Sequence, residues 1–173
     1  EFQHHDSLGT DQMIYPGEVN WMVAGEGITH SERTSEETRA GIHTMSGIQT
    51  WVALPKSHED AAPSFHHHGK PELPHLQDTG VQARVILGDA FGARSPVPVF
   101  SDMFYVDMII EAGNSAPIPS GHEDRAAYVV HGKIRVAGQD YEAGQMLIFR
   151  EGDDIAVQAG PLGARLMLLG GDV

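Results

Sequence analysis

The sequence contains no cysteine, which excludes disulfides, zinc–thiolate centres and cysteine nucleophiles. Basic residues are scarce: 11 Lys and Arg stand against 24 Asp and Glu, giving a formal net charge of −13 at pH 7. Such a charge disfavours direct nucleic-acid binding and contact with anionic membranes, because both present negative phosphates. Long apolar runs are also missing, and stretches such as Ala126–Val130 are too short to span a bilayer. We therefore expect neither nucleic-acid nor membrane partners.

No basic-then-apolar leader opens the sequence, which starts at Glu1 without a Met. The absence of a visible signal predicts a cytoplasmic location, or a nuclear one in a eukaryote. The unusual start predicts that the chain begins inside a larger protein.

Long amphipathic helices are lacking too. Hydrophobic residues recur mostly with a period of two, in short runs bounded by Gly, Pro or acidic turns, which is typical of strands. Ser35-Glu36-Glu37 predicts at most one short helical turn. The pattern favours an all-β sandwich or barrel. The predicted strands are Val19–Val23, Ile28–Thr34, Gly47–Leu54, Val81–Leu87, Met103–Glu111, Ala126–Val136, Gln145–Phe149, Ile155–Gln158 and Ala164–Leu169.

Between Pro55 and Pro74 the sequence becomes polar and irregular, which predicts a connecting segment between two β units. It contains His66-His67-His68. Adjacent strand residues point to opposite faces, so this run cannot gather three ligands on one face, and a solvated loop is favoured over a metal tract. Trp21 and Trp51 lie in strand-like runs, where core filling is favoured over stacking on a ligand.

The sharpest chemical signal is His30-Ser31-Glu32. In a strand, His30 and Glu32 are two residues apart and share one face, so a nitrogen and an oxygen donor lie together. Such a mixed pair suits Fe, Mn, Ni or Zn. From the spacing alone, the alternative to a metal site is an ordinary solvent-exposed strand face. Two ligands are also fewer than the three or four protein ligands of an open catalytic site.

Four stretches closely resemble the pirin family in sequence and in order. They are Asp6-Ser7-Leu8-Gly9, the run from Tyr15-Pro16-Gly17-Glu18 through Ile28-Thr29-His30-Ser31-Glu32, the run Gly47-Ile48-Gln49-Thr50-Trp51-Val52-Ala53-Leu54-Pro55, and more weakly Leu168-Leu169-Gly170-Gly171. The resemblance therefore extends over essentially the whole chain.

Pirins are bicupins, so the resemblance implies an all-β fold of two cupin-type β-barrels, the first of them incomplete in this chain. Residues 1–57 would be the remainder of an N-terminal metal-binding cupin, 58–80 a linker, and 81–173 a C-terminal degenerate cupin without metal ligands.

The resemblance also implies a metal, usually taken as iron, held by three His and one Glu. His30 and Glu32 match two of these ligands, and the other two belong to a His-x-His motif expected upstream of residue 1. Fe(II) is the expected cofactor, with Ni, Mn or Zn as alternatives. His4 and His5 are adjacent rather than alternating; they are expected in the strand after that motif, at the pocket rim and not as ligands.

The cupin motifs can be aligned on the second half of the chain. The first runs G-x5-H-x-H-x3-E-x6-G and fits Gly113 through Gly132, with Pro119, Gly121 and Arg125 at the ligand positions. The second fits Gly144 through Ile155, with Ile155 where its His belongs. None of these residues is a usual iron ligand, so we expect this cupin to be metal-free and structural.

Three functions follow as expectations. Some pirins are quercetinases, which implies a metal-dependent dioxygenase that opens a flavonol ring with O₂, as in quercetin 2,3-dioxygenase; Glu32 would then be a catalytic as well as a ligating residue. Others are regulators, which implies a non-enzymatic, metal- or redox-responsive protein that binds a transcription factor or an enzyme. The third is a metal-free structural cupin fragment.

Overall fold

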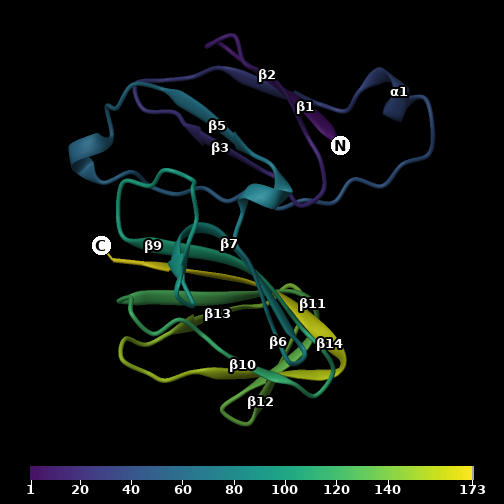
Figure 1. Ribbon diagram of the computed structural model, residues 1–173, viewed down its shortest axis with the longest axis vertical. Coiled ribbons are helices and arrows are strands. Elements are labelled where there is room, and N and C mark those ends of the chain that lie inside the picture. Colours follow the sequence, from purple (N-terminus) through teal and green to yellow (C-terminus); the bar gives the residue numbers. More distant parts are fainter. Residues whose placement is uncertain (173) are drawn as a thin grey trace. The chain divides into compact units, whose positions relative to one another are not determined.

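The computed structural model describes residues 1–172 and divides into two compact units, Glu1–Glu72 and Leu73–Val173. Strands make up most of the regular structure of both units, and the all-β fold is confirmed (Figure 1). Among residues 1–172, no helix is long and apolar enough to cross a membrane.

The first unit contains two small antiparallel sheets, ordered β2-β1-β4 and β3-β5. Ser35 caps the short helix by accepting a hydrogen bond from the Thr38 amide, which confirms the predicted helical turn. The elements are β1 (Phe2–Asp6), β2 (Asp11–Ile14), β3 (Val19–Val23), β4 (His30–Arg33), α1 (Glu36–Arg39), η1 (Lys56–His58), β5 (Ser64–His68) and η2 (Lys70–Glu72).

The second unit is one large antiparallel sheet, ordered β12-β11-β14-β9-β7-β6, with β10 paired to β14, β13 to β11 and β8 to β7. Its strands are β6 (His75–Asp78), β7 (Val81–Ala90), β8 (Ala93–Arg94), β9 (Met103–Ile110), β10 (Ser115–Pro117), β11 (Asp124–Val136), β12 (Gln139–Glu142), β13 (Met146–Phe149) and β14 (Ala156–Gly171).

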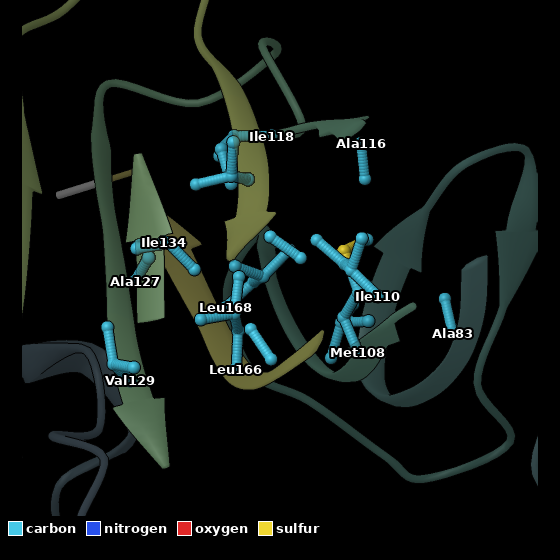
Figure 2. Close-up of a cluster of buried hydrophobic side chains, with 14 of the residues drawn as sticks. Ala83, Met108, Ile110, Ala116, Ile118, Ala127, Val129, Ile134, Leu166 and Leu168 are labelled. Carbon is cyan, nitrogen blue, oxygen red and sulfur yellow. The ribbon is translucent and has the colours of Figure 1, made fainter. Parts of the chain in front are cut away.

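The hydrophobic core lies in the second unit. Alternate residues of β9 are buried, so this strand directs one complete face inward. Leu166 and Leu168 of β14 lie between Ala127 of β11 and Met108 of β9 (Figure 2). Full burial of each large aliphatic side chain contributes about 1.5–3 kcal/mol. The buried side chains of these alternating positions thus stabilise the second unit.

Three predictions about secondary structure were wrong. Gly47–Leu54 forms no strand and is largely exposed, and Trp51 is 91% exposed instead of filling a core. The predicted loop His66-His67-His68 is part of β5, which pairs with β3. The irregular segment expected between Pro55 and Pro74 therefore contains β5, and the linker expected over 58–80 contains both β5 and β6.

Strand β14 joins two runs that the sequence separates, Ile155–Gln158 and Ala164–Leu169. Between Ala159 and Ala164 it skips register against β11. Such a bulge leaves the intervening residues out of the ladder while the strand continues.

Candidate metal centre

The pairing of β1 with β4 gathers four polar side chains. His4 lies directly opposite Glu32, and Asp6 lies opposite His30. Residues directly opposite each other in an antiparallel pair share a face, as do residues two apart in one strand. His4, Asp6, His30 and Glu32 therefore share one face of the sheet.

The entry into β4 depends on one glycine. Gly25 has φ +49°, and a Cβ at this position would collide with the Ala61 carbonyl. The same carbonyl accepts a hydrogen bond from the amide of Glu26 at 3.0 Å. This close backbone approach, which only glycine permits, fixes the loop that leads to His30.

His4 is the buried member of the group, with 2% of its surface exposed. Its Nε2 lies 3.0 Å from Oδ2 of Asp6, whose other oxygen accepts hydrogen bonds from the amides of Leu8 and Thr10. Burial raises the pKa of Asp6, but the hydrogen bonds from His4, Thr10 and Leu8 outweigh it and lower the pKa to about 2. Asp6 is therefore a fixed anion at neutral pH.

His30 and Glu32 lie at the open side of the group. Both are exposed, and Nδ1 of His4 lies 4.0 Å from Oε1 of Glu32. The rings of His4 and His30 are stacked, with centroids 5.5 Å apart. The predicted pair, His30 and Glu32, thus lies on one face of the sheet, and both residues are exposed.

His30 and Glu32 are ligand types that suit a divalent metal, but two ligands are too few to hold one. An imidazole nitrogen and a carboxylate oxygen are a donor pair that iron, nickel, manganese and zinc all accept. Among residues 1–172, no group of three or more His, Asp or Glu side chains is placed to hold a metal ion. A site built on His30 and Glu32 therefore needs further ligands beyond those that this chain brings together.

Sequence reasoning missed two neighbours of this group. Asp6 forms a His-x-Asp pair with His4, a spacing that mirrors His30-x-Glu32 and could have revealed it. Phe65 of β5 stacks on His4 with ring centroids 4.3 Å apart. No motif signals Phe65, because the contact depends on tertiary packing.

His5, the neighbour of His4 in the sequence, lies in different surroundings. It points to the opposite face from His4, is exposed and lies 3.3 Å from Asp11. The two adjacent histidines thus have different surroundings, and only His4 reaches the group around Glu32.

In the second unit, the aligned ligand positions hold a different chemistry. Arg125 is 1% exposed, and it lies on the face of β11 that also carries the core residues Ala127 and Val129. Its guanidinium donates to the carbonyls of Arg150 and Asp153, both at 2.9 Å, and to that of Pro119 at 3.3 Å. A cationic side chain that ties loops together stands where the motif expects a metal-binding Glu.

Two family models match the chain. "Pirin" matches residues 1–52 and "Pirin C-terminal cupin domain" matches residues 105–173. A "Pirin-like protein" of Caulobacter vibrioides is 46% identical over 173 residues, covering 99% of this chain and 59% of that protein.

Solved structures agree with the family models. A quercetin 2,3-dioxygenase from Acinetobacter baumannii superposes with a TM-score of 0.82 at 30% identity, over 99% of this chain and 56% of that one. The bacterial pirin YhhW from Escherichia coli, in complex with nickel(II), superposes with a TM-score of 0.72 at 19% identity, over 99% of this chain and 69% of that one, and shows the fold alone.

The fold and the matched segments define a cupin protein. Within that class, the chain belongs to the pirin family. It spans about half to about three fifths of the length of the curated relatives that it matches, 59% and 53% for two of them.

Proposed function

We propose that this chain supplies part of a metal-dependent dioxygenase of the quercetin 2,3-dioxygenase type, which opens a flavonol ring with O₂. The observation that carries the proposal is the placement of His30 and Glu32 on one face of the β1–β4 pair, beside the buried His4. The 30% identical relative from Acinetobacter baumannii, a quercetin 2,3-dioxygenase, supports this choice of substrate class.

In the complete protein, His30 would provide one nitrogen ligand and Glu32 one oxygen ligand, with two further histidines from outside this chain. Fe(II) is the first choice of metal, and Ni, Mn and Zn are the alternatives. A divalent metal held there supplies Lewis-acid stabilisation to the enolate-type oxygens of a flavonol.

The chain's own residues would do three things. His30 and Glu32 hold the ligand positions, and the second carboxylate oxygen of Glu32 can accept the proton of a substrate hydroxyl. Phe65 covers His4 with an apolar ring and keeps water from that side of the group. The reaction takes O₂ as its oxidant, and both of its oxygen atoms enter the products of ring opening.

The test uses the complete natural protein loaded with Fe(II), with flavonol absorbance and O₂ uptake measured together. His30→Ala is expected to lower turnover at least about a hundredfold, because even the loss of a residue that merely supports a ligand costs 10–100-fold. His5→Ala is the matched control, since His5 lies on the other face, and it should leave turnover unchanged. Full activity in folded His30→Ala would contradict the assignment.

The other expectations are outcomes of the same test. A protein that binds the metal but does not consume flavonol or O₂ supports a regulatory, non-enzymatic pirin that acts through a protein partner. A folded complete protein without any bound metal supports a structural cupin.

A further inference from the structure

Asp6 and His4 form a buried, hydrogen-bonded pair in a part of the chain that is otherwise open. The side chain of Asp6 is 0% exposed and that of His4 is 2% exposed, whereas Glu32 is 37% exposed. Burying an imidazole and a carboxylate costs solvation that such a pair regains only through good geometry. The burial of this polar pair beside an exposed surface therefore needs an explanation.

The geometry of Asp6 decides which way the His4 ring faces. One carboxylate oxygen is held by the amides of Leu8 at 2.9 Å and Thr10 at 3.0 Å, so the side chain cannot rotate freely. The other oxygen lies 3.0 Å from Nε2 of His4, which must donate because an ionised carboxylate only accepts. Nδ1 is thereby directed toward Glu32, 4.0 Å from its Oε1.

The ring of His4 also contacts its neighbours through its faces. It stacks on Phe65 with an interplanar angle of 19° and on His30 with an angle of 22°. Phe65 comes from the other small sheet of this unit, so His4 is held from two sheets at once. The stacked ring limits the orientations that His30 can adopt.

From these contacts we infer that Asp6 and His4 are positioning residues for the metal site: anchored by the backbone of residues 8 and 10, they orient the His30 ring and the Glu32 carboxylate before a divalent cation binds. The inference rests on the proposed metal site, but not on its reaction. Residues that orient metal ligands in this way raise affinity because the ligands lose less conformational freedom on binding.

The experiment titrates the complete protein with Co²⁺, whose visible absorbance reports both affinity and ligand geometry. His4→Phe keeps a ring of similar shape but removes both nitrogens, and Asp6→Asn removes the anchoring charge. Each is expected to weaken Co²⁺ binding about 10–100-fold and to change the absorbance bands. His5→Phe and Asp11→Asn are the matched controls, because this pair has the same residue types on the opposite face. Both controls should retain the affinity and the bands of the wild type.

His30→Ala is measured in parallel to show that Co²⁺ binds at this site. If His4→Phe does not fold, His4→Gln keeps a donor at the Nε2 position but has no nitrogen facing Glu32, and weakened Co²⁺ binding is expected there too. The inference is overturned if the folded His4 and Asp6 variants bind Co²⁺ with the affinity and spectrum of the wild type. Wild-type protein that binds Co²⁺ at His30, yet gives no flavonol turnover with Fe(II), would refute the proposed activity and leave this inference standing.

Discussion

Replacing Arg125 tests whether a guanidinium holds the second unit together where metal ligands are absent. Arg125→Met keeps most of the aliphatic volume but removes the hydrogen bonds to the carbonyls of Pro119, Arg150 and Asp153. The three carbonyls then lose the guanidinium as a donor, and the Arg150 carbonyl keeps only the amide of Asp153, at 3.5 Å; an acceptor that loses its donor without regaining water is costly.

The expected magnitude follows from the geometry. Hydrogen bonds from a charged donor contribute about 1.5–3 kcal/mol each, so the two bonds at 2.9 Å account for about 3–6 kcal/mol. Desolvation of the guanidinium, whose Nε is buried without a hydrogen-bond partner, offsets part of this gain. We expect Arg125→Met to lower the free energy of unfolding by about 2–4 kcal/mol. For a unit of about 100 residues this corresponds to a Tm lower by at least about 8 °C.

Thermal unfolding followed by circular dichroism measures the change, and Arg135→Met provides the control on the same strand. Arg135 is 57% exposed and donates to both oxygens of Asp140, at 2.7 and 3.0 Å. Solvent-exposed pairs contribute little, so this variant should unfold close to the wild type. Arg125, which donates to carbonyls, is thus predicted to contribute more to the Tm than Arg135, which pairs with a carboxylate. Equal Tm values for Arg125→Met and Arg135→Met would refute the reasoning.

Three further predictions concern other positions. Since the pKa of Asp6 falls from 3.8 to about 2 on folding, the unfolded chain binds more protons between these values; stability should rise with pH across this window, and urea titrations should show a flatter rise in Asp6→Asn. Gly88→Ala should prevent folding of the second unit, because a Cβ would collide with the Met103 carbonyl, whereas Gly138→Ala, also at positive φ but in open space, should cost only about 1–2 kcal/mol in chemical denaturation. In a Trp21→Phe variant, the remaining Trp51 should emit as a fully hydrated indole and be quenched readily by acrylamide, because it is 91% exposed.

The sequence predicts strands well where burial alternates along a single strand. Strand β9 begins at the predicted Met103 and ends at Ile110, one residue before the predicted end, because its own inward residues carry the signal. Gly47–Leu54 is also a predicted strand, but it joins no sheet among residues 1–172 and is largely exposed. Hydrophobic alternation predicts only that a segment can form a strand. The strand forms when a neighbouring segment offers backbone N–H and C=O groups for hydrogen bonding.

The candidate site shows the same division. His30 and Glu32 are found by their spacing, because a two-residue separation on one strand needs no tertiary knowledge. The neighbourhood of His4 and Glu32 depends on the register between β1 and β4, and strand register cannot be read from two short polar segments. The contact between His4 and Phe65 is even harder to predict from the sequence, because the two residues belong to different sheets.

The position of β14 has a consequence for how the protein is made. This strand lies between β11 and β9 in the sheet, although it follows both in the chain. During synthesis, β9 and β11 therefore leave the ribosome with unpaired edges and must wait until Ala156–Gly171 has been translated. Pairs such as Arg165 with Asp107, 58 residues apart, close only at that stage. Folding of the second unit is expected to be slow because it depends on β14, and the unpaired edges of β9 and β11 are where a chaperone would bind or aggregation would begin.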